Sequence, residues 1–455
     1  MIQKSQLAKL GLFDAKVPRY TSYPTAPQFS NDVGPATFAR WISQLPEDGS
    51  ISLYVHVPFC RRLCWFCACR TQGTQSEAPV RAYLETLKSE LSLLKRHLPP
   101  GVTLSRLHWG GGTPTFLDDG QLTRLMHHTG RLFRLLEDDR GDYGIELDPR
   151  TVDRARVGLL RGLGFNRASL GVQDLDPRVQ QAVNRIQPES MIRDVMVEAR
   201  ELGFRSINIG LIYGLPHQNQ QTFAETLEVI IDMSPDRLSV FNYAHLPERF
   251  KPQRRIKEED LPSPEEKLAI LGNCITKLTE VGYHYVGMDH FAKTDDELSR
   301  AQARKELHRN FQGYTTDDAA TLIGIGGSSI GRFEGGYIQN TVGTSVYEAQ
   351  VSNGILPADK GYALTEDDKM RGYFIEKLMC DLRMDLSEVH TRFPTQYPSF
   401  ITQVINVTRN DDLGLCKLQD GIFSIPEEAR PFTRIVASLF DAHFASGEKK
   451  FSQAV

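Results

Sequence analysis

The chain has 455 residues, 40% of them hydrophobic and 24% charged, which suffices for one large domain and a smaller one with buried cores. Its net charge of −4, from 53 basic and 57 acidic side chains, gives no reason to expect a nucleic-acid or an electrostatically bound membrane partner. No apolar run approaches the roughly 18 residues of a membrane span. The first 20 residues lack the apolar core of a signal peptide. We therefore expect a cytoplasmic protein with neither nucleic-acid nor membrane partner.

The first 50 residues are predicted to form an N-terminal arm of mostly irregular structure. Within it, residues 17–26 (VPRYTSYPTA) combine prolines with turn-forming residues, a composition that disfavours a helix. This segment is expected to be extended and to lie across another part of the protein.

Strands and helices alternate from residue 51 onward. Short apolar strands are predicted over 51–57, 104–109, 143–147, 167–172, 206–211 and 237–242. Helical periods fill the intervals, over 80–97, 122–136, 151–163, 191–202 and 221–233. This alternation predicts repeated β/α units around a parallel sheet, arranged as an incomplete (β/α)6 barrel. Ligand sites in such folds gather at the carboxyl ends of the strands, so the loops there are expected to form one site.

The remainder of the chain is less regular. A polar helix is predicted over 295–306, an irregular segment rich in donors over 308–316, and a glycine-rich turn over 323–331. From about residue 363 the pattern becomes helical. The predicted domains are therefore the arm (1–50), a catalytic domain (51–362) and a small helical C-terminal domain (363–455).

Four of the seven cysteines fall within ten residues, and they give the strongest functional signal. A CxxxCxxC loop directly after a strand can direct the thiolates of Cys60, Cys64 and Cys67 at one corner of a cubane cluster, leaving the fourth iron for an external chelate. Cys69 follows Cys67 too closely to reach the same cluster easily, and its role is left open. The alternative is a structural zinc site, which normally uses two separated ligand pairs, and no second pair appears. The three isolated cysteines are expected to be buried apolar residues: Cys274, Cys380 and Cys416.

Further polar residues follow the other predicted strands. The glycines of 110–115 (GGGTPT) let the backbone approach a ligand closely. A carboxylate at Glu146 can accept two sugar hydroxyl groups, and Arg185 can hold a carboxylate through two hydrogen bonds. Asp148 precedes Pro149 and is better explained as a helix cap.

Residues 54–69 (YVHVPFCRRLCWFCAC) resemble the oxygen-independent coproporphyrinogen III oxidase branch of the radical S-adenosylmethionine (SAM) superfamily. This resemblance implies a [4Fe–4S] cluster on Cys60, Cys64 and Cys67, with SAM bound to the fourth iron and a second SAM in the same pocket. It also implies SAM contacts from residues at matching positions, namely Tyr54, Phe66, Gly111, Gly112, Thr113, Glu146, Gln173, Arg185, Gly210, Ala244 and Ile330.

Gly210 departs from the family pattern, which has an aspartate at this position. Without that carboxylate, a charge-assisted hydrogen bond to the second SAM is lost, at a cost of roughly 1.5–3 kcal/mol. The second SAM site is therefore expected to be weaker than the first.

The segments 17–26 and 308–316 resemble the decarboxylase rather than a haem-binding chaperone of the same family, which is one alternative. The other alternative is a different radical SAM reaction on a tetrapyrrole. By the resemblance, a 5′-deoxyadenosyl radical removes a hydrogen from a propionate of coproporphyrinogen III, and loss of CO2 and one electron leaves a vinyl group. Two such steps give protoporphyrinogen IX.

Several partners follow from this resemblance. The small-molecule substrate is coproporphyrinogen III, and the electron donor is a protein such as flavodoxin or ferredoxin. The chain is expected to be a monomer. No catalytic residue is assigned. The substrate carries four carboxylates, so a further hypothesis is that Arg19 or Arg309 clamps a propionate.

Overall fold

The computed structural model describes residues 17–444, so the predicted arm and C-terminal domain both extend beyond the described range. Contacts divide these residues into two compact units. The barrel unit contains residues 30–266 and 319–363, and the arm unit contains residues 17–29, 267–318 and 364–444. The domain borders proposed at residues 50 and 362 stay predictions.

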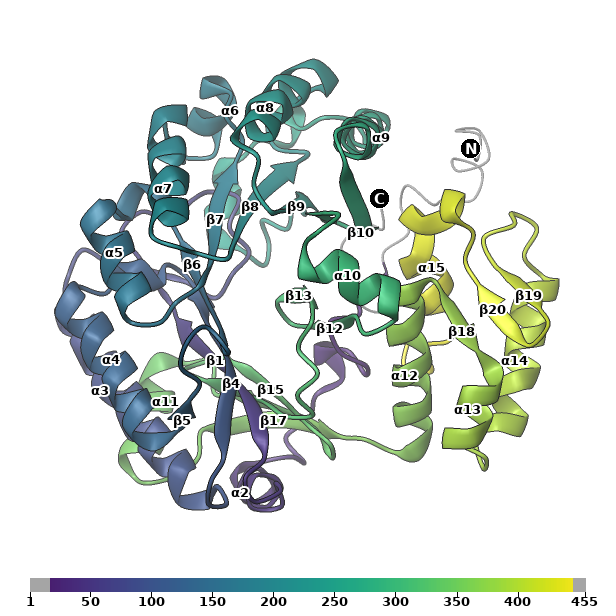
Figure 1. Cartoon of the computed structure of the whole chain (residues 1–455), viewed down its shortest axis with the longest axis horizontal. Helices are drawn as coiled ribbons and strands as arrows, with labels where there is room; N and C mark the ends of the chain where they lie inside the picture. The colour runs from purple at the N-terminus through teal and green to yellow at the C-terminus, as the bar shows by residue number, and fades with distance from the viewer. Residues whose placement is uncertain (1–16, 445–455) are drawn as a thin grey trace. The chain divides into compact units, whose positions relative to one another are not determined.

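Six parallel strands form the centre of the barrel unit (Figure 1). They run in the order β9-β8-β7-β6-β4-β1. Their bounds are β1 (Ser50–Val57), β4 (Thr103–Gly111), β6 (Asp142–Leu147), β7 (Arg167–Gln173), β8 (Ser206–Tyr213) and β9 (Arg237–Asn242). Each neighbouring pair is parallel. The predicted incomplete (β/α)6 barrel is thereby confirmed.

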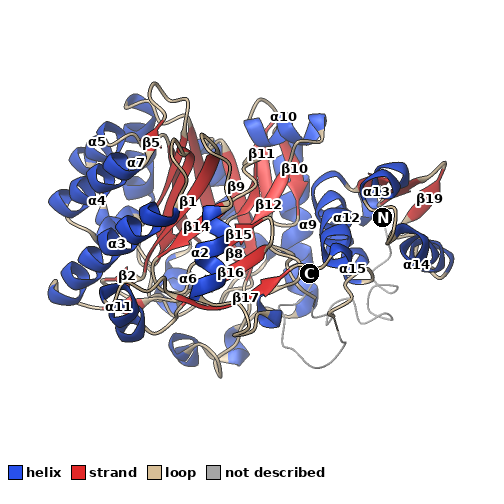
Figure 2. Cartoon of the chain, turned by 90° about the horizontal axis from the view of Figure 1, so that it is seen from below, coloured by secondary structure: helices blue, strands red, loops and turns tan. Residues whose placement is uncertain are grey.

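Helices follow these strands and line one side of the sheet (Figure 1), and several of them can be seen on that side again in Figure 2. They are α3 (Ala78–His97), α4 (Asp119–Leu132), α5 (Arg154–Gly162), α6 (Pro177–Ala182), α7 (Glu189–Glu201) and α8 (Gln220–Met233). Burial alternates along the strands as expected for a sheet with one face packed: in β8, Ile207 and Ile209 are fully buried, whereas Asn208 and Gly210 are half-buried. The half-buried face is the one available to a ligand.

The sheet continues past β1, which the sequence did not predict. Strand β14 (Leu322–Ile325) pairs parallel to β1, and β15 (Ile330–Phe333), β16 (Gly336–Asn340) and β17 (Ala358–Ala363) follow in antiparallel order. Helix α11 (Thr344–Ser352) lies between β16 and β17 in the chain. The segment predicted as a glycine-rich turn therefore contains a strand, a tight loop and the start of another strand.

A second correction concerns the N-terminal residues. Residues 17–25 have no helix, as predicted, but α2 (Pro35–Ser43) forms where irregular structure was expected. Phe38 and Ile42 lie one turn apart on α2 and are both buried. The ring of Phe38 packs edge-on against Phe333 of β15 at 5.6 Å. Helix α2 is short and lies between turn residues, so its apolar residues repeat too few times for the sequence to predict a helix.

The arm unit combines helices with short hairpins. Its elements are β10 (Tyr283–Gly287), β11 (His290–Lys293), α10 (Glu297–Arg304), β12 (His308–Asn310), β13 (Gly313–Thr315), α12 (Glu366–Asp381), α13 (Leu386–Arg392), α14 (Tyr397–Arg409), α15 (Thr433–Ser438) and most of α9 (Pro264–Glu280). A small sheet of β18 (Arg383–Asp385), β20 (Ile422–Ser424) and β19 (Lys417–Gln419) joins the predicted helices. The segment 308–316, predicted to be irregular, is a hairpin. No helix within residues 17–444 is long and apolar enough to cross a membrane.

Candidate functional site

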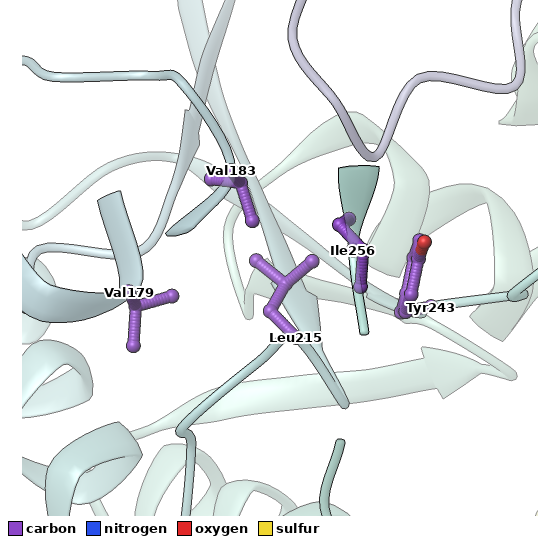
Figure 3. Packing of buried hydrophobic residues seen from close by; sticks show 5 residues of the cluster. All are labelled: Val179, Val183, Leu215, Tyr243 and Ile256. Carbon is purple, nitrogen blue, oxygen red and sulfur yellow. The ribbon is translucent and has the colours of Figure 1, made fainter. Parts of the chain in front are cut away.

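The cysteine loop leaves the end of β1 and is fixed by contacts on both sides. Cys60 lies in β2 (Phe59–Cys60), which pairs with β3 (Gln72–Gly73). The Trp65 N–H donates to the Val183 carbonyl at 2.9 Å. Trp65 and Phe66 pack against a buried cluster (Figure 3) formed by Val179, Val183, Leu215, Tyr243 and Ile256. The loop is thus anchored on residues that follow β7, β8 and β9.

Two arginines flank the sulfur of Cys64. Arg185 Nη1 lies 3.3 Å from Cys64 Sγ, and Arg150 Nη2 lies 3.6 Å from it. Asp148 joins the two guanidinium groups, at 2.7 Å from Arg150 and 3.4 Å from Arg185. Asp148 also caps the turn at Pro149, as predicted. Two guanidinium groups therefore place positive charge beside the Cys64 sulfur.

The other loop cysteines have different surroundings. Burial raises the pKa of the Cys60 thiol to about 11, and its sulfur lies 3.4 Å from the Thr113 hydroxyl. A hydrogen bond from Cys69 lowers the pKa of Cys67 to about 6. Thr71 also lies within 3.9 Å of the Cys67 sulfur. Cys69 is therefore a hydrogen-bond partner of Cys67.

The three cysteines fit a cubane cluster better than a single metal ion. Within residues 17–444, no three His, Cys, Asp or Glu side chains are arranged to hold one metal ion. A cubane does not need that arrangement, because each thiolate binds a different iron. The donor set of Cys60, Cys64 and Cys67, with cations beside one sulfur, suits an anionic iron–sulfur cluster.

The glycine turn after β4 packs directly against the end of β1. Gly111 has a φ of +114°, and a Cβ there would lie 2.6 Å from the His56 ring. A Cβ on Gly112 would lie 2.8 Å from the backbone of Pro58 and Phe59. Only glycine allows this approach. The turn therefore places the Thr113 hydroxyl beside Cys60.

Glu146 lies at the end of β6 and faces this turn. Its carboxylate accepts the Gly111 N–H at 3.1 Å and lies 3.4 Å from His108 Nε2. Burial alone would raise the pKa of Glu146, but these partners hold it below its usual value. Glu146 is thus an ionised acceptor at the predicted cofactor face.

Two histidines on this face were missed by the sequence reasoning. The Tyr54 ring stacks on His108 at 6.0 Å, and its hydroxyl lies 3.1 Å from His56 Nδ1. His56 Nε2 lies 3.1 Å from the Arg70 carbonyl, which ties β1 to the end of the cysteine loop. His56 lies two residues after Tyr54 on β1, and this period-two spacing could have revealed it. His108 pairs with Tyr54 in the β1–β4 register, a contact that spacing along β4 does not indicate.

The side chains of Gln173 and Arg185 both lie close to Gly171. A Cβ on Gly171 would lie 2.8 Å from Gln173 Nε2 and 3.1 Å from Arg185 Nη2. Arg185 Nη2 donates to the Gly171 carbonyl, while its buried Nε has no hydrogen-bond partner in the described part of the chain. Gly210 pairs with Gly171 in the β7–β8 register, and a Cβ there would meet nothing closer than the Leu170 carbonyl at 3.7 Å. The ends of β7 and β8 therefore offer a ligand the Arg185 Nε donor and the open space beside Gly210.

The outermost predicted residues border the same face. Buried Gln253 donates to the carbonyls of Phe66 at 2.8 Å and Ala244 at 3.2 Å. Ile330 lies against Gly324, which pairs with Tyr54 in the β1–β14 register. All of the predicted cluster and SAM residues therefore lie in the barrel unit, around the carboxyl ends of its parallel strands.

The proposed propionate clamps have other partners, and both lie in the arm unit. Arg309 is buried and donates to the carbonyls of Tyr20 at 3.4 Å and Arg19 at 3.1 Å. Its guanidinium lies 4.3 Å from the centre of the Tyr314 ring. Arg19 pairs with Asp289. The contacts of Arg309 indicate that it anchors the N-terminal arm, so the clamp hypothesis finds no support in them.

Comparison with known proteins identifies the class to which this fold and site belong. A model of the radical SAM superfamily matches residues 54–230. The chain is 43% identical over 448 residues to an oxygen-independent coproporphyrinogen III oxidase of Cereibacter sphaeroides, covering 98% of each chain. It is 44% identical to that of Pseudomonas aeruginosa, with 97% of each covered. The solved structure of coproporphyrinogen III oxidase from Escherichia coli, described as a radical SAM enzyme, is 40% identical with a TM-score of 0.90, covering 94% of this chain and 100% of that one.

The chain is therefore a member of the radical SAM superfamily. Within that superfamily it belongs to the family of oxygen-independent coproporphyrinogen III oxidases, since it is similar to them over almost its whole length.

Proposed function

We propose that this chain converts two propionate side chains of coproporphyrinogen III into vinyl groups, which yields protoporphyrinogen IX in anaerobic haem biosynthesis. Each propionate loses one hydrogen atom, one CO2 and one electron. The observation that carries the proposal is the cysteine loop itself, whose Cys64 sulfur lies between Arg185 and Arg150 at the same strand ends as Glu146. Similarity to named oxidases over 98% of the chain points to the same substrate.

The proposal assigns roles to residues of this chain. A [4Fe–4S] cluster is held by Cys60, Cys64 and Cys67. The residues that surround SAM are Tyr54, Phe66, Gly111, Gly112, Thr113, Glu146, Gln173, Arg185, Gly210, Ala244 and Ile330. When bound, the cluster and SAM together supply hydrogen-atom abstraction from an unactivated carbon. The ionised Glu146 accepts hydroxyl groups, and the free Nε of Arg185 donates to an anionic group. The packing of Trp65 and Phe66 against the buried cluster fixes the cysteine loop.

The test is anaerobic reconstitution followed by incubation with SAM, dithionite and coproporphyrinogen III. A divinyl product, released CO2 and four irons with SAM on each chain are expected. Cys64→Ala should abolish product and reduce the iron content, whereas Cys416→Ala, outside the site, should retain both. A methylated or ring-opened product, or tight haem binding without SAM cleavage, would contradict the proposal.

We further propose that the electron comes from a small acidic carrier protein of the flavodoxin or ferredoxin type, and that the chain acts as a cytoplasmic monomer. Arg61, Arg62 and Arg70 are exposed on the cysteine loop. Arg61 pairs with Glu77, so Arg62 and Arg70 carry the positive charge of this surface. Such charge attracts an acidic partner. Arg62→Glu should slow reduction by reduced flavodoxin but not by dithionite. Equal slowing by both reductants would contradict this docking surface.

A further inference from the structure

A buried carboxylate lies behind the predicted SAM pocket, and no predicted function uses it. Glu90 is on α3 and is fully buried. Its Oε2 accepts the Gly326 N–H at 2.9 Å and the Tyr347 hydroxyl at 2.6 Å, and its Oε1 accepts Asn340 Nδ2 at 2.7 Å. In the described part of the chain, Glu90 forms no ion pair. A carboxylate buried without a cation is costly, and its three donors offset only part of that cost.

Glu90 holds one end of a tight loop of residues 326–329, which joins β14 to β15. Gly326 has a φ of +92°, and a Cβ there would lie 2.5 Å from the Tyr83 hydroxyl. The Gly327 N–H donates to that hydroxyl at 2.9 Å. Ser328 also has a positive φ, of +68°. The loop conformation is strained for ordinary residues, so it depends on acceptors outside the loop.

The same helix also holds the end of β1. The Tyr83 hydroxyl donates to the His56 carbonyl at 2.9 Å, and the His56 ring lies 3.1 Å from the Tyr54 hydroxyl. Ile330 follows the loop directly and begins β15. Tyr83 and Glu90 of α3 therefore fix the backbone next to two residues of the predicted SAM pocket, Tyr54 and Ile330.

We propose that Glu90 is a positioning residue for SAM, because its carboxylate fixes the loop of residues 326–329 and thereby places Ile330 against the cofactor. This inference rests on the proposed function, in which Ile330 borders SAM. Glu90 itself does not reach the pocket, so its effect is on affinity and not on the chemical step.

The charge state of Glu90 gives the inference a pH dependence. Burial raises the pKa of Glu90 to about 7, although Tyr347, Gly326 and Asn340 oppose the shift. The other titratable groups facing this region are Tyr83 on α3 and Tyr347 and Glu348 on α11. As the pH falls through about 7, the carboxyl gains a proton and loses an acceptor position. SAM affinity is therefore expected to rise as the pH rises from 6 to 8.

Stability should change in the opposite direction. An unfolded glutamate ionises near pH 4.3. Because the folded group binds its proton more tightly, the stability it contributes is present at low pH and is lost as the pH rises through about 7. A neutral replacement should therefore leave folding at pH 8 unharmed while weakening SAM binding. A purely structural residue would not separate these two effects.

The experiment compares Glu90→Gln with Glu85→Gln, an exposed carboxylate on the same helix that pairs with Lys88. SAM binding is measured at equilibrium on the reconstituted enzyme from pH 6 to 8.5, together with KM and kcat. Glu90→Gln should raise the Kd and KM for SAM about three- to tenfold at pH 8, leave kcat unchanged and flatten the pH dependence. Without cofactors, the amides of residues 326–330 should exchange faster in Glu90→Gln than in Glu85→Gln.

Tyr347→Phe is the second variant, and it keeps the inference testable if Glu90→Gln does not fold. Loss of this donor removes a hydrogen bond that favours the ionised carboxylate, so the pH midpoint for SAM binding should move upward. Wild-type affinity and an unchanged pH profile in both variants would overturn the inference. If the wild-type protein itself bound no SAM, the proposed function would fail instead.

Discussion

Arg185 Nη1 lies 3.3 Å from the sulfur of Cys64, a residue 121 positions earlier in the chain. The guanidinium also touches Asp148 and the Gly171 carbonyl, so it joins the cysteine loop to the ends of β6 and β7. A fixed cation beside one ligand sulfur stabilises the extra negative charge that a reduced cluster carries. This contact links a residue predicted to bind SAM with a residue predicted to bind iron.

Replacement of Arg185 should therefore make the cluster harder to reduce. Arg185→Met keeps the length of the side chain but removes its charge and its hydrogen bonds. We expect SAM cleavage to slow about tenfold to a hundredfold, as for the loss of a charged hydrogen bond, and the reduction potential to become more negative. Spectroscopic redox titration and 5′-deoxyadenosine formation measure the two effects.

The matched control is Arg178→Met, which changes an exposed arginine on the nearby helix α6. It should retain the wild-type potential and rate. An unchanged potential in Arg185→Met would show that Arg185 acts only on SAM.

Asp142 at the start of β6 should contribute strongly to stability. Three arginines surround it: Arg167 at 2.7 Å, with Arg106 and Arg205 also in contact. Although burial opposes the effect, these cations lower the pKa of Asp142. Asp142→Asn should reduce the free energy of unfolding by about 1–2 kcal/mol at pH 7, because three partly exposed arginines lose their shared counterion.

The sign of the pH dependence follows from the lowered pKa. The stabilisation is complete above the unfolded value near 3.9 and is lost as the pH falls through the folded pKa. Urea unfolding at pH 7 and pH 3.5 should thus show a smaller difference between the wild type and Asp142→Asn at the lower pH. Asp232→Asn, at an exposed ion pair with Arg193, should change stability little at either pH.

The parallel core was predictable because each of its strands carries a strong local signal. Residues such as Ile207, Ile209 and Leu211 are apolar, β-branched or both, and are followed by turn residues. The strands beyond β1 were not predicted, since Gly324, Gly326 and Gly331 interrupt their pattern and read as a turn. Their pairing with β1 is a long-range contact that local sequence does not encode.

The candidate site shows the same division. Spacing alone indicated Cys60, Cys64 and Cys67, and strand-end positions indicated Glu146. The partners that tune these residues could not be predicted, because Arg150 and His108 meet Cys64 and Glu146 only after the strands align. Asp148 was recognised as a cap, but its bridge between two arginines depends on a contact with Arg185, which lies 37 positions later in the chain. The sequence thus predicted which residues bind the cluster and SAM, whereas the charged partners of these residues could be identified only from the structure.

Arg309 should stabilise the N-terminal arm. Its hydrogen bonds to two arm carbonyls and its stacking on Tyr314 are lost in Arg309→Ala, which should reduce the free energy of unfolding by about 2–4 kcal/mol. Limited proteolysis should then cut within residues 17–25 sooner than in the wild type. Arg304→Ala removes only an exposed pair with Glu306 and serves as the control. Normal stability with weakened coproporphyrinogen binding would restore the clamp hypothesis.

Gly210→Asp tests whether the second SAM site is limited by one missing carboxylate. The strand backbone at Gly210 has no positive φ, and a Cβ there would have the Leu170 carbonyl as its nearest neighbour, at 3.7 Å. The variant should therefore fold. On the proposed function, a carboxylate at this position regains a charge-assisted hydrogen bond, which should tighten the weaker SAM about tenfold to a hundredfold.

The readouts for Gly210→Asp are the number of SAM molecules bound per chain and the ratio of monovinyl to divinyl product. If Gly210 limits the second site, the wild type should accumulate the monovinyl product at low SAM concentration, and Gly210→Asp should not. Gly210→Asn offers a neutral side chain of the same size and should recover only part of the gain, because an amide forms the weaker hydrogen bond. Two SAM molecules bound equally tightly in the wild type would show that other residues already replace the missing carboxylate.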